Sequence, residues 1–383
     1  MVPDQEGFLY PGVDMDKCVS CGLCEKVCPI LHREHHEEKT EGYIIRYKDE
    51  KIVEESTSGG AFTAFATYLL SKGYVVYGAG YGKEMQVVYK MASKPEELHE
   101  MRGSKFVQST LGNTFRTIKK QLKESKKVLF TGTPCQVSGL IRYLGSKPET
   151  LICIDFVCRG VPSPGLWKNY VTMMEKKYNA KMVGARFKHK TYGYHATTMK
   201  IDFANGKSWY GSGRVDPMMK AFVSEMASRP SCHACAFKGA GRQSDITMFD
   251  CYEFSKLTGM EDDGKGYSSV LVHSQTGKKL LHAVEGDVCK IPVPTDRLIH
   301  ENGIMVCNSA RPHEKRNVFY DAASVMSIDK AIQKIAPITI RDYIIEKAKR
   351  IIFLTGTMKY IRKLKKKQNV KIVKQERQSG EQL

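Results

Sequence analysis

The chain has 383 residues, a hydrophobic content of 42% and a formal net charge of +19. That length exceeds what one hydrophobic core usually holds, and the composition is typical of a folded protein rather than a disordered one. No run approaches the roughly 20 apolar residues that a membrane-spanning helix needs, and the first residues do not have the pattern of a secretory signal. We therefore expect a cytoplasmic protein, whose 12 cysteines are metal ligands or redox centres rather than structural disulfides.

Taken in chain order, the sequence patterns predict an α/β fold with mixed strands. Helical spacing of apolar residues predicts helices at 62–69, 95–101, 114–123, 134–144, 167–178 and 278–284. Apolar extended runs predict strands at 74–81, 127–130, 151–157, 195–203, 208–210 and 267–273. Asn205-Gly206 is a favoured two-residue hairpin turn between two of these strands.

The patterns also divide the chain into segments. A short Cys-rich segment occupies residues 1–30 and a polar connector residues 31–56. Two lobes of the body are expected at 57–145 and 146–337, and a basic tail follows at 338–383.

The positive charge is concentrated in this tail, where residues 341–383 hold 13 Lys and Arg against 4 Asp and Glu. A helix over 338–366 would place apolar residues such as Ile344 and Ile351 near one face. The tail is expected to be either a solvated charged segment or a contact for an acidic partner or for the inner face of an anionic membrane. A nucleic-acid partner is not expected, because the chain has no recognition motif.

The most specific motif is formed by Cys18, Cys21, Cys24 and Cys28. Its C-x-x-C-x-x-C-x-x-x-C-P spacing is that of bacterial ferredoxins, in which cysteine thiolates hold a 4Fe–4S cube. Gly22 permits the tight backbone turn that such a loop needs. In two-cluster ferredoxins the fourth cysteine of the run binds the other cluster, and the sequence has no second run. Either Cys28 completes its own cube, or an upstream half has been lost, or Met1 is not the true start.

Four further cysteines form a second candidate site: Cys135, Cys158, Cys232 and Cys235. Cys135 is predicted at the N-terminus of a helix, where free amide groups and the helix dipole favour a thiolate. The C-x-x-C pair is also typical of structural zinc. The four cysteines fit either a zinc site or a second cube, and the spacing alone does not distinguish them. The others are predicted to be packing residues: Cys153, Cys251, Cys289 and Cys307.

Two stretches are candidates for binding phosphate. Ser58-Gly59-Gly60 precedes a helix, whose N-terminal amide groups can approach a pyrophosphate, although a simple helix cap has the same pattern. Thr131-Gly132-Thr133 lies between a strand and a helix, where ligands gather in open α/β sheets. Because Cys135 follows directly, we expect a cluster ligand beside the bound cofactor.

Seven sequence blocks occur in the order seen in one family, from residue 6 to about residue 282: EGFLYPGVDMDKCVSCGLCEKVCP, STSGGAF, RGSKFVQS, VLFTGTPCQVSGL, VCRGVPSPGLW, RPSCHACAFKGAGRQSDIT and KGYSSVLVHSQTGKKLL. They resemble the beta subunits of coenzyme F420 (deazaflavin) hydrogenases and dehydrogenases, and ferredoxin-dependent relatives such as 7-hydroxymethyl chlorophyll a reductase.

The resemblance implies an iron–sulfur flavoprotein oxidoreductase with a mixed-sheet flavin-binding body in two lobes and a small N-terminal ferredoxin-like segment. It implies an FAD site at Ser58, Gly59, Gly60, Gly103, Ser104, Lys105, Thr131, Gly132 and Thr133. It also implies that the second group of cysteines holds a 4Fe–4S cluster, so that one or two clusters are expected in all. Electrons would come from a ferredoxin-type donor or a redox partner subunit.

The resemblance leaves the substrate open. The most similar subtypes occur in bacteria that make surface polysaccharides, which suggests a link to that biosynthesis. Alternatives are a deazaflavin-dependent hydrogenase or dehydrogenase beta subunit, a non-catalytic electron-transfer subunit, and a zinc-stabilised relative without redox function.

Two stretches depart from the family pattern. Relatives usually have Asp-Phe-Trp-Gly where this chain has Asp250-Cys251-Tyr252-Glu253, and Phe-Arg-x-Lys is replaced by residues 187–190, in which Lys188 stands for the arginine. A lysine does not reproduce the bidentate grip of arginine on an anion. Lys188, Lys190 and His195 are either ligands of an anionic substrate or surface residues of a basic sheet.

Overall fold

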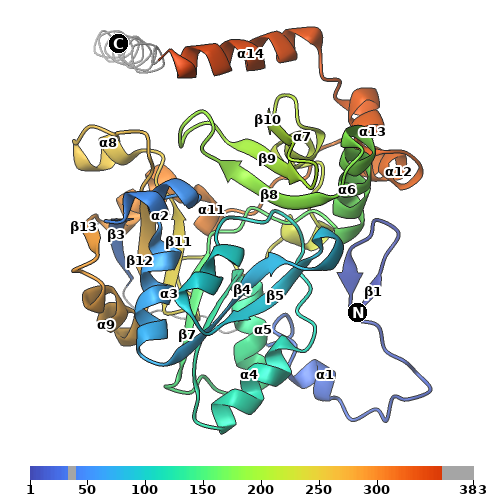
Figure 1. Cartoon of the computed structure of the whole chain (residues 1–383). Coiled ribbons are helices and arrows are strands. Elements are labelled where there is room, and N and C mark those ends of the chain that lie inside the picture. Colours follow the sequence, from blue (N-terminus) through green and yellow to red (C-terminus); the bar gives the residue numbers. More distant parts are fainter. Residues whose placement is uncertain (33–39, 356–383) are drawn as a thin grey trace, which may run out of the picture. The chain divides into compact units, whose positions relative to one another are not determined.

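The computed structural model describes residues 1–32 and 40–355, and Figure 1 shows the elements in chain order. It comprises two compact units, Met1–Pro337 and Ile338–Leu383. The first unit ends at the residue where the sequence patterns place the end of the body. Among the described helices, none is both long and apolar enough to cross a membrane.

An eight-stranded mixed sheet forms the centre of the first unit, in the order β13-β3-β12-β11-β7-β6-β4-β5. Its central strands β4, β6, β7 and β11 are parallel, and the outer strands pair antiparallel. The bounds are β3 Glu41–Tyr47, β4 Tyr74–Tyr81, β5 Val87–Ala92, β6 Lys127–Gly132, β7 Leu151–Phe156, β11 Ile246–Asp250, β12 Ser268–Val272 and β13 Val288–Pro292. The expected α/β class with mixed strands is confirmed.

Two smaller sheets accompany the large one. Strands β8 Met182–His189, β9 Thr198–Phe203 and β10 Ser208–Ser212 form a three-stranded antiparallel sheet in the order β10-β9-β8. The turn at Asn205-Gly206 lies between β9 and β10 as predicted, and Gly206 has the positive φ of 79° that this turn requires. Strands β1 Val2–Pro3 and β2 Leu9–Tyr10 form a short antiparallel pair.

The helices of the first unit are mostly short. Their bounds are α1 Leu23–Lys26, α2 Glu50–Glu55, α3 Ala61–Ser71, α4 Thr114–Lys123, α5 Pro134–Leu144, α6 Pro164–Tyr178, α7 Pro217–Val223, α8 Phe254–Thr258, α9 Gln275–Ala283, α10 Thr295–Asn302, α11 Ile304–Cys307, α12 Arg316–Val325 and α13 Ile328–Ile335. Three 3₁₀ turns are η1 Lys83–Met85, η2 Pro95–Glu100 and η3 Pro230–Cys232.

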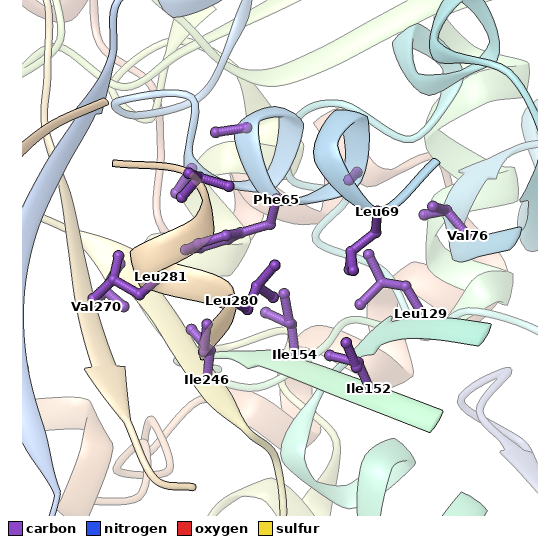
Figure 2. Close-up of a cluster of buried hydrophobic side chains, with 14 of the residues drawn as sticks. Phe65, Leu69, Val76, Leu129, Ile152, Ile154, Ile246, Val270, Leu280 and Leu281 are labelled. Carbon is purple, nitrogen blue, oxygen red and sulfur yellow. The ribbon is translucent and has the colours of Figure 1, made fainter. Parts of the chain in front are cut away.

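Alternating side chains of the central strands pack against helices on both faces of the sheet, because successive residues of a strand point to opposite sides. On one face, Leu129 and Ile152 pack with Phe65 of α3 and Leu280 of α9 (Figure 2). On the other face, Phe130 and its neighbours pack with α4 and α5. The sheet is thus the middle layer between two helical layers.

Two sequence-based boundaries differ from the structure. The stretch 31–56 contains β3 and α2, so it is not only a polar connector; the buried Ile44 and Ile45 are part of the core. The expected division into two lobes at residue 145 is not confirmed, because β6 and β7, which lie on either side of it, pair in one sheet within one compact unit. The strand β3 was not predicted because the exposed charged residues 48–51, which follow it directly, made the whole stretch resemble a polar connector.

The second unit contains α14, Ile340–Leu354. Thr339 caps it by accepting a hydrogen bond from the amide of Asp342. Ile344 and Ile351 are exposed, with 61% and 62% of their surface accessible. The predicted helix over 338–366 is therefore observed in its first half, and the rest of the tail lies outside the described residues.

Candidate functional site

The second group of cysteines lies at the carboxyl edge of the parallel strands. Cys135 follows β6 and is the second residue of α5, which begins at Pro134. Cys158 follows the neighbouring strand β7 by two residues. Cys232 ends η3, and Cys235 comes three residues later. Because carboxyl ends of adjacent parallel strands meet at one edge of a sheet, the fold brings distant cysteines to one place.

The loops that carry these cysteines lie close together, because a Cβ atom on Gly160, two residues after Cys158, would lie 3.4 Å from the Cys232 Cβ. Loss of solvent raises the pKa of the Cys135 thiol to about 11, with smaller contributions from Cys158 and Cys235. Desolvation likewise raises the pKa of Cys158 to about 11, and Cys232 and Cys235 add to it. Cys135 is nevertheless exposed to solvent, so its raised pKa reflects protein atoms packed around the thiol and not a fully buried side chain. A bound cation would have to displace these protons.

A donor set of four cysteine thiols fits an iron–sulfur cluster and also a structural zinc ion. In residues 1–32 and 40–355, no three His, Cys, Asp or Glu side chains converge closely enough to hold one metal ion. Thiolates are the ligands that iron–sulfur clusters prefer.

Polar groups around these cysteines fix the loops that carry them. The Lys238 ammonium donates to the carbonyl groups of Cys158 at 2.7 Å and Met305 at 2.6 Å. The amide of Gly160 donates to the Cys158 sulfur at 3.4 Å, and the amide of Cys235 donates to Ser309 Oγ at 3.0 Å. Hydrogen bonds to a cluster ligand and a nearby cation both favour the thiolate form.

Two buried nitrogen atoms in the same loop have no hydrogen-bond partner: Arg229 Nε and His233 Nε2. Each is within three residues of Cys232 along the chain. The His233 ring donates through Nδ1 to the Ala310 carbonyl at 2.9 Å, so its Nε2 is an acceptor, whereas Arg229 Nε is a donor. An unsatisfied buried polar group is costly in an apolar environment, and Arg229 Nε is suited to a bound group that accepts a hydrogen bond.

The three predicted flavin-site stretches are connected in space. Ser104 donates its amide to Thr57 Oγ1 at 3.1 Å, which joins residues 103–105 to the Ser58 loop. Gly78 of β4 connects this region with β6, because a Cβ atom there would lie 3.0 Å from Thr131 Oγ1 and 3.1 Å from Met101 Sδ. One continuous region therefore runs from the start of α3 to the end of β6.

The Ser58 loop is used in part for packing. Gly59 donates its amide to Ser268 Oγ at 3.0 Å, and a Cβ atom at Gly59 would lie 2.7 Å from the Ser268 nitrogen. This glycine is therefore required by the sheet. Gly60 has a φ of 82° and begins α3 without a side-chain cap, so the amide groups of the first turn receive no side-chain acceptor. They remain suited to an anion.

The loop at Thr131–Thr133 is well ordered by hydrogen bonds. Thr131 Oγ1 donates to the Tyr77 carbonyl at 2.8 Å, and Thr133 donates its amide to Gln136 Oε1 at 3.0 Å. Tyr89 donates to the same Gln136 oxygen at 2.9 Å. Thr133 Oγ1 lies 3.1 Å from Cys135 Sγ, which places the predicted cofactor loop directly beside a cysteine of the second group.

A basic pocket lies next to the Ser58 loop. Its lining includes Glu54, Glu55, Thr57, Arg102, Gly103, Ser104, Lys105, Arg186, Lys188, His189 and Lys190. The Lys105 ammonium lies within hydrogen-bond distance of four main-chain carbonyl groups, those of residues 100–103, which share its three protons. Desolvation, followed by repulsion from Lys90 and Arg186, lowers the pKa of Lys105 to about 7. Desolvation also lowers the pKa of Lys190 to about 8. The basic side chains outnumber the two glutamates in this lining, and Arg102 pairs with Glu55, so the pocket has an excess of positive charge.

Lys188, Lys190 and His195 are held by protein groups. Lys188 Nζ donates to Asp250 Oδ2 at 2.5 Å and to Tyr252 at 2.6 Å. Desolvation alone would lower its pKa, but Asp250 and Tyr252 raise it. Lys190 donates to the carbonyl groups of Val53 and Ser58, and His195 Nε2 lies 2.8 Å from Asp262 Oδ2. Only 7% of the Lys188 side chain is accessible, so it is not a surface residue.

The two stretches that depart from the family pattern are in contact with each other, which the sequence did not predict. Lys188 replaces the family's arginine, and Asp250 and Tyr252 belong to the changed Asp-Phe-Trp-Gly stretch. Tyr194 also contacts Asp250, at 3.2 Å, and its ring stacks on Tyr252 with centroids 5.1 Å apart. The substituted Lys188 thus forms an ion pair with the retained Asp250 and a hydrogen bond with the substituted Tyr252. The joint occurrence of the two substitutions was the signal that could have revealed this contact.

The first group of cysteines lies on a largely exposed loop. Cys18, Cys21 and Cys24 are exposed, and Cys28 is half-buried. Gly22 adopts a φ of 68° and precedes α1, so the tight turn expected at this glycine is present. Among the cysteines predicted to be packing residues, Cys153 and Cys251 are buried. The prediction is wrong for Cys289 and Cys307, which are exposed because an edge strand and a short surface helix carry them.

Comparison with known proteins identifies the family. Two family models describe the amino-terminal and carboxyl-terminal parts of the beta subunit of coenzyme F420 hydrogenase/dehydrogenase, and they match residues 43–115 and 125–296 respectively. The chain belongs to this family. A model described as a 4Fe-4S binding domain matches residues 10–35, which contain the first group of cysteines. The family resemblance seen in the sequence blocks is thus confirmed.

Two individual proteins are similar to the chain. The chain is 31% identical over 292 residues to the coenzyme F420-dependent sulfite reductase of Methanocaldococcus jannaschii, an alignment that covers 71% of this chain and 42% of that protein. The chain therefore spans less than half the length of this curated relative. A chain of the F420-reducing [NiFe] hydrogenase complex from Methanosarcina barkeri is 17% identical, with a TM-score of 0.45 and coverage of 79% of this chain and 94% of that one.

Proposed function

We propose that the chain is an iron–sulfur flavoprotein oxidoreductase that takes electrons from a ferredoxin-type donor or a redox partner subunit and delivers them to a substrate. When bound, 4Fe–4S clusters supply one-electron transfer and FAD links it to two-electron chemistry. The observation that carries the proposal is the convergence of Cys135, Cys158, Cys232 and Cys235 at the carboxyl edge of the sheet, with Thr133 beside Cys135.

The chain's own residues have distinct roles in this proposal. The first group of cysteines holds one cluster, in the segment that matches a 4Fe-4S binding domain, and the second group holds another. Lys238 and the Gly160 amide stabilise the thiolate charge of the second group. Cys158 is half-buried in its loop, which limits access of water to this ligand.

The proposed FAD site follows the connected region described above. The uncapped start of α3 at Gly60 and the basic residues beside Gly103, Ser104 and Lys105 are suited to the pyrophosphate. Ser58 borders this region, and Gly59 allows the loop to approach the sheet. The loop of Thr131, Gly132 and Thr133 leads from there to Cys135, which suits electron transfer between the two cofactors.

A deazaflavin-dependent reaction is a second candidate, favoured by the similarity to a coenzyme F420-dependent sulfite reductase. Reduced deazaflavin and reduced ferredoxin would then be tested in parallel as electron donors. Reduction of the protein's flavin by deazaflavin alone would assign this second function. The proposal also includes a cytoplasmic location, a link to polysaccharide biosynthesis, and a contact of the tail with a membrane or an acidic partner. It leaves the substrate open.

The test is anaerobic purification followed by measurement of iron, acid-labile sulfide, zinc and released flavin in one sample. Two cubes imply about eight irons per chain, together with one FAD. The variant Cys232→Ser is expected to lose the body cluster, whereas Cys289→Ser, which removes an exposed cysteine on β13, serves as the matched control. Zinc without iron or flavin would contradict the proposal and support the zinc-stabilised alternative.

A further inference from the structure

Residues 6–10, which precede the first group of cysteines, are packed on the body, and we call them the N-terminal anchor. Leu9 donates its amide to Gln108 Oε1 at 2.9 Å, and Gln108 Nε2 donates back to the Leu9 carbonyl at 2.9 Å. Phe8 has no accessible surface. The cysteines at 18–24 are exposed, so the anchor is where the described part of this segment is fixed most firmly.

The anchor approaches α6 so closely that no side chain fits between the two backbones. A Cβ atom on Gly165 would lie 2.9 Å from the Gly7 Cα, and one on Gly7 would lie 2.7 Å from the Gly165 Cα. Gly165 also donates its amide to the Gly7 carbonyl at 3.2 Å, and Ser163 Oγ donates to the Glu6 carbonyl at 2.6 Å. A glycine pair permits this contact because it has no Cβ.

An ion pair and two aromatic rings hold the other side of the anchor. The Arg316 guanidinium donates to both carboxylate oxygens of Glu6, at 2.8 and 2.5 Å, and its Nε donates to the Ser228 carbonyl at 2.8 Å. Phe8 packs on Tyr320, with ring centroids 5.5 Å apart. A bidentate arginine pair fixes orientation as well as distance.

The last residue of the anchor contacts the loop that leads to the second group of cysteines. The Arg229 guanidinium lies 4.0 Å from the centroid of the Tyr10 ring. The Arg229 carbonyl also accepts a hydrogen bond from the Cys232 amide at 2.9 Å. Arg229 is thus in contact both with the anchor and with the main chain of a proposed cluster ligand.

We propose that the N-terminal anchor, held by Gly165, Arg316 and Arg229, positions the first group of cysteines beside the Cys232 loop, so that one electron passes between their two clusters within a single chain. The inference rests on the proposed function. One electron leaves the N-terminal site and one arrives at the body site, while no bond is made or broken. The ferredoxin-type donor of the proposed function then replaces the electron.

Gly165→Ala in the full chain tests this positioning. The substitution leaves the charges and all cysteines unchanged, and α6 tolerates alanine as a helix former. Gly286→Ala is the matched control, because a Cβ atom there meets no atom within 4 Å and its φ is not positive. Both variants and the wild type are reduced anaerobically, and three quantities are measured: iron and sulfide content, hydrogen exchange of the amides of residues 6–10, and the magnetic interaction between the two reduced clusters by electron paramagnetic resonance.

Gly165→Ala is expected to retain its iron and sulfide, to exchange the anchor amides at least about tenfold faster, as loss of a locally stabilised segment predicts, and to lose the magnetic interaction. Gly286→Ala should match the wild type. Glu6→Gln is a milder second variant, expected to change in the same direction if Gly165→Ala fails to fold. An unchanged magnetic interaction with normal iron content would overturn the positioning role alone. Wild-type protein without iron would instead refute the proposed function, and this inference with it.

Discussion

Lys105 gives the proposed pyrophosphate site a characteristic pH dependence. Its amine is surrounded by protein, and desolvation lowers its pKa to about 7, so it loses its proton as the pH rises through 7. An anion in the pocket favours the protonated amine. Above pH 7, binding must therefore take up one proton, and the dissociation constant should rise about tenfold per pH unit, or about 1.4 kcal/mol. Lys190 has a pKa of about 8, so above pH 8 binding of the anion must take up a second proton.

The assay is anaerobic calorimetric titration with ADP, which carries the pyrophosphate and adenosine of FAD. Affinity should fall about tenfold between pH 7 and 8, where ADP itself no longer changes its charge, and fall more steeply beyond, where the limiting slope approaches about a hundredfold per unit. Lys105→Gln should bind ADP more weakly at pH 6.5 and lose the decrease between pH 7 and 8. Lys123→Gln, on the exposed surface of α4, is the matched control and should behave as the wild type.

Two results would refute this reasoning. ADP affinity that does not change between pH 6.5 and 8 would show that the lysine proton is not coupled to binding. An identical slope in Lys105→Gln and the wild type would assign the coupling to another group, and the anion site at residues 103–105 would then be wrong.

Three further predictions concern single contacts. Cys21→Ser and Cys232→Ser should each remove about four of eight irons, because they belong to different cubes, and iron analysis of the two variants checks this independence. Lys238→Met leaves two main-chain carbonyl groups without their donor, at 2.7 and 2.6 Å in the wild type; this should cost about 1–3 kcal/mol and be visible as faster cluster loss to a chelator. Tyr170→Phe removes the donor that lies 2.5 Å from the buried Asp216 carboxylate, so thermal scans should show a lower unfolding temperature, consistent with a loss of about 1–3 kcal/mol.

The parts of the fold that the sequence predicted well are those with strong local signals. The helix at Thr114–Lys123 and the strand at Tyr74–Tyr81 have the predicted bounds, because uninterrupted apolar spacing defines them. Pro134 marks the start of α5 as a first-turn proline should. Local patterns of this kind need no knowledge of the rest of the chain.

The strands that were missed depend on distant partners. β3 pairs with β12 and β13, which come from the other end of the first unit. β8 was missed because Gly184 and the basic residues that follow interrupt its apolar alternation, and a register irregularity occurs between Met182 and Gly184. Tertiary pairing decides the conformation of such segments, and the sequence pattern within them does not.

The same distinction applies to the site. Cys135, Cys158, Cys232 and Cys235 were singled out by residue type and by family resemblance, and the fold brings them together. Their spacing did not distinguish a cluster from zinc, because that choice depends on how far apart the loops hold the thiols. The Lys188–Asp250 ion pair joins residues of two different sheets, so neither segment alone predicts it.

The sheet and the N-terminal anchor both depend on contacts between residues far apart in the sequence, and this has a consequence for how the chain folds during synthesis. β3 acquires both of its neighbours only after β12 and β13 have been translated, and Glu6 meets Arg316 later still. Pairings of such high sequence separation form slowly and late in folding. During synthesis the N-terminal anchor therefore leaves the ribosome long before Arg316, its last partner, exists. The anchor should accordingly dock only after most of the first unit has been translated, and until then the first group of cysteines lies on a segment that is not yet held on the body.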